Sequence, residues 1–189
     1  MDAKTQPNAN SAGSTPPFQS RTIALVGLMG AGKSTVGRRL ASALDREFFD
    51  SDNEIEKAAG LSIADIFTLH GESEFRRGER RVLERLLKNP PHILATGGGA
   101  YLDSNTRKLL RECVITVWLN ADLETLWERV NRRNHRPLLK NADARNVLTR
   151  LLQEREPIYS KADLVVNSED GPHSTTVQKI IAAVQGWTP

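Results

Sequence analysis

A glycine-rich segment near the start of the chain carries the residue types that bind a polyphosphate. Residues 27–35 read GLMGAGKST and contain the pattern Gly-x-x-x-x-Gly-Lys-Ser. In such a loop the glycines let backbone N–H groups approach phosphate oxygens, the lysine reaches the β- and γ-phosphates, and the serine hydroxyl binds Mg²⁺. The pattern predicts that a nucleoside triphosphate binds to the following residues: Gly30, Ala31, Gly32, Lys33, Ser34 and Thr35.

The residues on either side of this segment support the prediction, because they place it between a strand and a helix. Residues 22–26 form an apolar run, and Val36, Leu40 and Leu44 repeat at four-residue spacing after the motif. The N-terminus of that helix would add the positive end of its dipole at the phosphate site. The alternative, an ordinary glycine-rich turn, would leave the lysine and serine as coincidence.

Two more predicted strands end in residues that suit a ligand site. Asp50 and Asp52 follow a strand near residues 46–49, and three glycines at 97–99 follow a strand at 92–96. Because ligands bind beyond the carboxyl ends of parallel strands, we expect both segments to face the phosphate loop. The alternating positions of the two aspartates on an extended backbone indicate two separate roles. A flexible turn is the alternative for the glycines.

The remaining elements must hold these segments in place, and strands alternate with helices along the whole chain. This alternation predicts an α/β fold with a parallel sheet covered by helices on both faces. A basic segment at 131–137 is either a solvated charge run or a lid that brings arginines to the triphosphate. The other expected elements are short helices over 53–76, a longer helix opened by Gly71, helices at 103–111 and 122–130, a strand at 114–119, a helix from Asp143 that breaks at Pro157, a strand at 162–166 and a helix near 175–184.

Composition limits the class of protein. The 189 residues suffice for one domain, at 21–189, after a polar tail at 1–20 that we expect to be disordered. The net charge of +3 comes from well-mixed signs, which favours small anionic ligands and no nucleic acid. No apolar run suits a membrane span or a signal peptide, and a single cysteine, Cys113, suits a reducing cytosol, so we expect a cytoplasmic protein that binds no membrane. Cys113 itself is expected in the core. No long apolar stripe indicates a partner, so we expect a monomer.

Together these motifs resemble the shikimate kinase family. The resemblance implies a P-loop fold of the nucleoside-monophosphate-kinase type, with a five-stranded parallel sheet. It also implies transfer of phosphate from ATP, with Mg²⁺, to the 3-hydroxyl of shikimate in the pathway to chorismate and the aromatic amino acids. The segments that carry it are residues 27–35, Asp50-Ser51-Asp52, Gly71-Glu72 with Phe75-Arg76, Gly97-Gly98-Gly99, Arg136-Pro137-Leu138-Leu139 and Arg155-Glu156-Pro157-x-Tyr159.

The resemblance also implies a role for individual residues. Lys33, Asp52 and Arg136 would be catalytic, with Asp52 binding the shikimate hydroxyls as a possible base and Arg136 closing on the phosphoryl group from a lid at about 131–143. Ser34 and Asp50 would hold the hydrated Mg²⁺. Arg129 would lie along the adenine. The substrate residues would be Asp52, Arg76, Gly98, Gly99 and Arg155, with Arg76 and Arg155 binding the carboxylate and the substrate segment spanning about 51–78.

Two other functions fit part of this pattern. A kinase of another small metabolite, such as gluconate or a nucleotide, would also need arginines and an aspartate beside the phosphate loop. A nucleotide-driven switch or motor would need only the loop. Such proteins usually place an aspartate after an apolar strand, whereas the strand at 92–96 runs into glycines.

Overall fold

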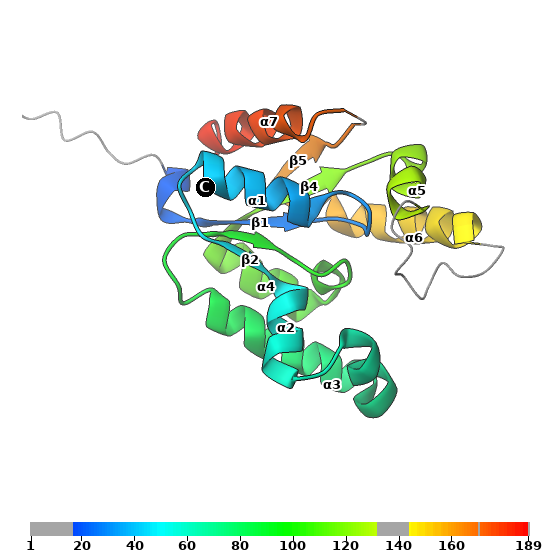
Figure 1. The fold of residues 1–189 in the computed structure, drawn as a ribbon. Helices are drawn as coiled ribbons and strands as arrows, with labels where there is room; N and C mark the ends of the chain where they lie inside the picture. Colours follow the sequence, from blue (N-terminus) through cyan, green and yellow to red (C-terminus); the bar gives the residue numbers. More distant parts are fainter. Residues whose placement is uncertain (1–16, 132–143, 170, 189) are drawn as a thin grey trace, which may run out of the picture.

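The computed structural model describes residues 17–131, 144–169 and 171–188, which form one five-stranded sheet and the helices around it (Figure 1). The strand order is β2-β3-β1-β4-β5, and every neighbouring pair is parallel. The predicted α/β fold with a five-stranded parallel sheet is therefore confirmed. The strands are β1 (Thr22–Val26), β2 (Phe48–Asp50), β3 (Ile93–Ala95), β4 (Val114–Asn120) and β5 (Leu164–Asn167).

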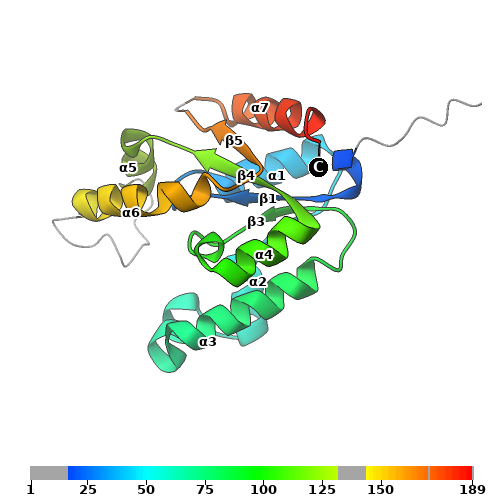
Figure 2. The ribbon, with the colours of Figure 1, turned by 180° about the vertical axis from the view of Figure 1, so that it is seen from behind.

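Helices cover both faces of the sheet (Figures 1 and 2). On one face α1 (Lys33–Ala43) packs against α7 (His173–Gln185), and on the other face α4 (Ser104–Cys113) packs against β4. Beside β2, α2 (Ser51–Ala59) packs against α3 (Ile63–Leu86). At the carboxyl ends of the strands, α5 (Leu123–Asn131) packs against α6 (Ala144–Tyr159), and the short 3₁₀ helix η2 (Ala100–Leu102) contacts α6.

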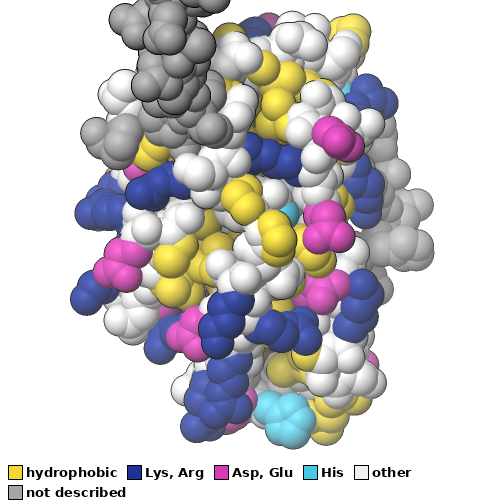
Figure 3. All heavy atoms as spheres, turned by 90° about the vertical axis from the view of Figure 1, so that its left-hand side faces the viewer, with side chains coloured by type: hydrophobic (Ala, Val, Ile, Leu, Met, Phe, Trp, Pro, Cys, Tyr) yellow, Lys and Arg dark blue, Asp and Glu magenta, His cyan; other side chains and the backbone are white. Residues whose placement is uncertain are grey.

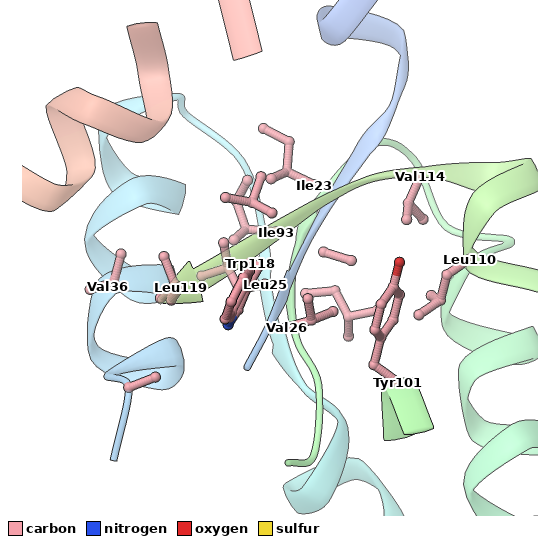
Figure 4. Packing of buried hydrophobic residues seen from close by; sticks show 14 of the residues in the cluster. Ile23, Leu25, Val26, Val36, Ile93, Tyr101, Leu110, Val114, Trp118 and Leu119 are labelled. Carbon is pink, nitrogen blue, oxygen red and sulfur yellow. The ribbon is translucent and has the colours of Figure 1, made fainter. Parts of the chain in front are cut away.

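The hydrophobic core lies on both sides of the central strands. Ile23, Leu25 and Ile93 are fully buried, as expected of strands that are covered on two faces. Val36 of α1 packs on one side of the sheet and Leu110 of α4 on the other (Figure 4). The burial of both faces explains why these strands are continuous apolar runs in the sequence.

The region after β2 bends at Gly71, where the sequence predicts that a longer helix opens. Asp50 caps α2, and Ser62 caps α3 by accepting a hydrogen bond from the N–H of Asp65. Gly71 interrupts α3 with a φ of 77° and a ψ of 173°, so a second, longer helical segment follows it. These glycine and capping positions set the direction in which α3 approaches the site.

The predicted disordered tail is too long at its C-terminal end. Pro17–Ser20 form a 3₁₀ helix, η1, and the Phe18 side chain is only 7% exposed. The Arg46 guanidinium donates to the carbonyls of Phe18 and Gln19 at 3.0 Å each, and it lies over the Phe18 ring. These contacts come from a residue 28 positions away, so the polar composition of the tail could not indicate them.

Two local predictions are also wrong. Cys113 is exposed, although the next residue, Val114, is buried; the side chain leaves the core at the junction of α4 and β4. The helix α6 does not break at Pro157 but continues to Tyr159. A proline in the last turn removes one intrahelical hydrogen bond, and the burial of Tyr159 holds that turn in place.

The surface is charged with both signs. The face in Figure 3 carries Lys and Arg together with Asp and Glu side chains, and hydrophobic side chains lie between them. Surface ion pairs such as Arg85–Glu54, at 3.2 Å, contribute little to stability. Among the helices that the structure describes, none is long and apolar enough to cross a membrane.

Candidate active site

The carboxyl ends of three neighbouring strands form the floor of the site. Ala95 of β3 pairs with Leu25 of β1 on one side and with Asp50 of β2 on the other, so the three strands end together. The loop after β1 therefore lies beside Asp50 and beside the glycines that follow β3. This register brings together the segments that the sequence predicted to share a ligand.

The loop after β1 presents the N-terminus of α1 to this edge. Gly30 and Gly32 have φ values of 87° and 94°, a region that residues with a Cβ rarely adopt. Gly32 is the N-cap, so α1 begins at Lys33. The N–H groups of the first turn have no partner within the helix, and with the helix dipole they favour a bound anion.

The Lys33 side chain folds back over the loop. Its ammonium donates to the carbonyl oxygens of Gly27 at 2.7 Å and Leu28 at 3.0 Å. A phosphate would offer the same ammonium charged oxygens, which make stronger hydrogen bonds than neutral carbonyls. Lys33 is thus held at the place where a polyphosphate in the loop would meet it.

Ser34 and Asp50 form a pair of oxygen ligands. The Ser34 hydroxyl donates to Asp50 Oδ2 at 2.6 Å, and Asp50 Oδ1 accepts from the N–H of Asp52 at 3.1 Å. A hydroxyl and a carboxylate suit Mg²⁺, which binds few protein oxygens and keeps several waters, so these two residues fit a hydrated Mg²⁺. The predicted extended backbone through both aspartates is wrong, because α2 begins at Ser51.

One cavity of about 340 Å³ joins the loop to these carboxylates. Arg129 of α5 forms one end of it: Nη2 donates to the carbonyl of Glu169 at 2.6 Å, and Nη1 donates to Ser168 Oγ at 3.0 Å. The guanidinium therefore connects α5 to the segment after β5. The cavity lining includes these predicted residues: Gly30, Gly32, Lys33, Ser34, Thr35, Asp50, Asp52, Gly98 and Arg129.

A second group of charges lies against the glycines after β3. A Cβ at Gly99 would lie 2.6 Å from Nη2 of Arg76, and a Cβ at Gly97 would overlap the carboxylate of Asp52. Glycine at these positions allows an arginine and an aspartate to approach the same short loop. A carboxylate and hydroxyl groups on one small molecule could therefore be bound together here.

Arg76 is held by an acidic residue that the sequence analysis missed. Glu79 is 1% exposed, and its Oε2 accepts from Arg76 Nη1 at 2.8 Å. In the described part of the chain its other oxygen, Oε1, has no hydrogen-bond partner. Burial raises the pKa of Glu79, and the hydrogen bond and charge of Arg76 oppose the rise. The available signal was the i,i+3 spacing of an arginine and a glutamate on one helix.

Arg155 reaches the same glycines from α6. Its Nη1 lies 3.5 Å from the carbonyl oxygen of Gly98, and the Tyr159 hydroxyl donates to that same oxygen. Arg155 and Arg76 thus flank residues 97–99, although neither lines the main cavity around Lys33. Gly98 belongs to both groups and connects them.

The remaining predicted residues differ in where they lie, and several residues that were not predicted also line the cavity. Ala31 is buried, and its carbonyl accepts from Arg129 at 3.4 Å. Arg136 lies outside the described residues, and so does the predicted lid at about 131–143 except for its first residue, Asn131. Thr96, at a strand end before the glycines, could have been identified by position. Met29 occupies a variable position of the motif at 27–35, and three further lining residues belong to no motif: Val130, Gly171 and His173.

The geometry supports one kind of chemistry. The first site can bind an anion at a helix N-terminus and has a lysine and a pair of Mg²⁺ ligands. It adjoins a second site, which has two arginines and an aspartate. Phosphoryl transfer requires donor and acceptor to be positioned in this way and their charges to be neutralised. Asp52 lies between the two sites.

Comparisons with known proteins agree with this arrangement. The family model described as shikimate kinase matches residues 29–185. A shikimate kinase of Caulobacter vibrioides is 52% identical over 169 residues, which cover 89% of this chain and 84% of the relative. That of Paramagnetospirillum magneticum is 53% identical over 161 residues, which cover 85% and 83%. The solved structure of shikimate kinase from Acinetobacter baumannii in complex with shikimate has a TM-score of 0.81 and 41% identity, and the match covers 87% of this chain and 93% of that one.

Proposed function

The chain belongs to the shikimate kinase family, and we propose that it transfers the γ-phosphoryl group of ATP to the 3-hydroxyl of shikimate, giving shikimate 3-phosphate and ADP. The relatives favour shikimate over gluconate or a nucleotide as acceptor, and an enzyme over a nucleotide-driven switch. The reaction would belong to the pathway that leads to chorismate and the aromatic amino acids.

One observation carries the proposal beyond the family resemblance. Asp52 lines the cavity that contains Lys33 and Ser34, and its carboxylate also lies against Gly97, next to the position where Arg76 meets Gly99. A hydroxyl at Asp52 would therefore be close to a phosphate in the loop. The acceptor carboxylate would lie farther along residues 97–99, between Arg76 and Arg155.

The residues then take the following roles. Lys33 would exchange the carbonyls of Gly27 and Leu28 for phosphate oxygens, and Asp52 would orient the attacking hydroxyl. Ser34 and Asp50 would hold Mg²⁺, which when bound neutralises phosphate charge. Arg129 would lie along the adenine. Arg136, outside the described residues, would bind the phosphoryl group in transfer, a role worth about 10³–10⁵ in rate for an arginine.

The oligomeric state, the location and the partners of the protein are also part of the proposal. We expect it to act as a monomer in the cytoplasm and to bind neither nucleic acid nor membranes. The support is the mixture of charges on the surface and the small number of exposed large hydrophobic side chains, which among the described residues are Phe67, Leu69 and Val165.

The test is ADP production from ATP and Mg²⁺ with shikimate, gluconate or a nucleoside monophosphate as acceptor. We expect shikimate alone to stimulate ADP production strongly. A Lys33→Met variant should lose this stimulation, and the loss would show that the activity belongs to this protein and not to a contaminant. Equal turnover with every acceptor, or with none, would contradict the proposal and favour a nucleotide-driven switch.

A further inference from the structure

The carbonyl of Gly98 is the point where α6 meets the acceptor side of the site. Two side chains of α6 reach this oxygen. The Tyr159 hydroxyl donates a close hydrogen bond to it, whereas Nη1 of Arg155 lies 3.5 Å away, at the outer limit of such a bond. The stronger contact is therefore made by a residue that has no role in the proposed reaction.

The hydroxyl of Tyr159 and the guanidinium of Arg155 approach the same carbonyl oxygen. Burial raises the pKa of the Tyr159 phenol, and the guanidinium of Arg155 opposes the rise through its charge and a side-chain hydrogen bond. The neutral hydroxyl thus donates to the Gly98 carbonyl, the same oxygen that Arg155 approaches. This one oxygen of the substrate loop therefore brings Tyr159 together with the arginine expected to bind the substrate carboxylate.

The ring of Tyr159 cannot move easily. The side chain is 1% exposed and stacks with Trp118 at 6.1 Å and Tyr101 at 6.4 Å between ring centroids. Trp118 and Tyr101 are themselves part of the core (Figure 4). Because close packing fixes the ring, the position of the hydroxyl is set by the fold and not by the ligand.

We propose that Tyr159 is a positioning residue for the acceptor, whose hydroxyl binds the Gly98 carbonyl and so leaves the Arg155 guanidinium available to the acceptor carboxylate. This inference rests on the proposed function, because it takes Arg155 as a carboxylate ligand. Without the hydroxyl, the Gly98 carbonyl would be left with the Arg155 guanidinium as its side-chain donor. The guanidinium would then bind the protein instead of the substrate.

Tyr159→Phe removes the hydroxyl and keeps the stacked ring. We expect the KM and Kd for shikimate to rise about tenfold, as for the loss of a hydrogen bond to a charged group, while kcat and the KM for ATP change less than about twofold. The matched control is Tyr101→Phe. Its ring is equally buried and its hydroxyl donates to the Lys161 carbonyl at 3.1 Å, away from the site, so shikimate binding should not change.

A second measurement separates positioning from general damage. Arg155→Lys is made in the wild-type and Tyr159→Phe backgrounds, and shikimate affinity is measured by calorimetry. We expect the two substitutions to be clearly less than additive, because each disturbs the same guanidinium. Additive effects, an unchanged shikimate KM in Tyr159→Phe, or an equal rise in Tyr101→Phe would overturn the inference. A wild-type protein that ignores shikimate would instead overturn the proposed function and this inference with it.

Discussion

Gly99→Ala tests where the Arg76 guanidinium must lie. The backbone of Gly99 already suits alanine, because its φ of −103° and ψ of −13° fall in the right-handed region. The added Cβ would lie 2.6 Å from Nη2, 3.0 Å from Nη1 and 3.2 Å from Cζ of Arg76. The substitution therefore acts on this arginine and not on the main chain.

The expected size of the effect follows from these distances. Ordinary contacts begin near 3.4 Å, so the guanidinium must move by about 0.8 Å. A misplacement of about 1 Å can cost about 100-fold, so we expect the KM for shikimate to rise about 10- to 100-fold with a smaller change in kcat. The guanidinium lies at the end of a long, partly exposed side chain and can shift without moving the backbone. The free energy of unfolding should therefore fall by less than about 1 kcal/mol.

The assay is ADP release at saturating ATP with shikimate varied, together with urea unfolding. The control is Gly78→Ala, on the same helix as Arg76, where no atom lies within 4 Å of an added Cβ. This control should keep its KM and gain about 0.5–1 kcal/mol, because alanine favours a helix over glycine. If Gly99→Ala kept the KM of the control, Arg76 would not hold the substrate in the position described here.

Three other predictions concern binding and stability. Arg155→Lys should raise the KM for shikimate about tenfold, since one bidentate pair becomes a single contact; an unchanged KM would remove Arg155 from the carboxylate site. Burial lowers the pKa of His92, whose Nε2 has no hydrogen-bond partner among the described residues. The folded state thus resists protonation, so stability should be constant above about pH 6.5 and fall below it in urea unfolding; a His92→Gln variant with the same slope would contradict this. Gly37→Ala, whose Cβ would lie 2.5 Å from the Phe48 ring, should lower the free energy of unfolding by about 1–3 kcal/mol and leave the KM values unchanged; a gain in stability would refute the overlap.

Much of the site could be predicted from short stretches of sequence. The glycines, lysine and serine of residues 27–35 lie together at one strand-to-helix junction, and Ser62 caps the helix that follows it. The alternation of apolar strands and amphipathic helices predicted the parallel sheet. In each case the interaction joins residues that are near one another in the chain, so the pattern itself contains the information.

Other features depend on which distant segments pack together. The bonds from Arg46 to η1 and from Tyr159 to Gly98 join residues 28 and 61 positions apart. The exposure of Cys113 depends on how α4 turns into β4. No local pattern contains these contacts, because they arise only when the core has closed.

The sequence by itself determined the phosphate loop, the α/β fold and the types of charge available to the site. Only the tertiary structure decided that α2 begins between the two aspartates, that the buried Glu79 holds Arg76, and that Tyr159 and Arg155 meet at the Gly98 carbonyl. The physical reason is the distance along the chain over which each kind of interaction acts. Backbone preferences and helix or strand periodicity act over a few residues, whereas the position of a charged group is set by close packing between elements far apart in the chain.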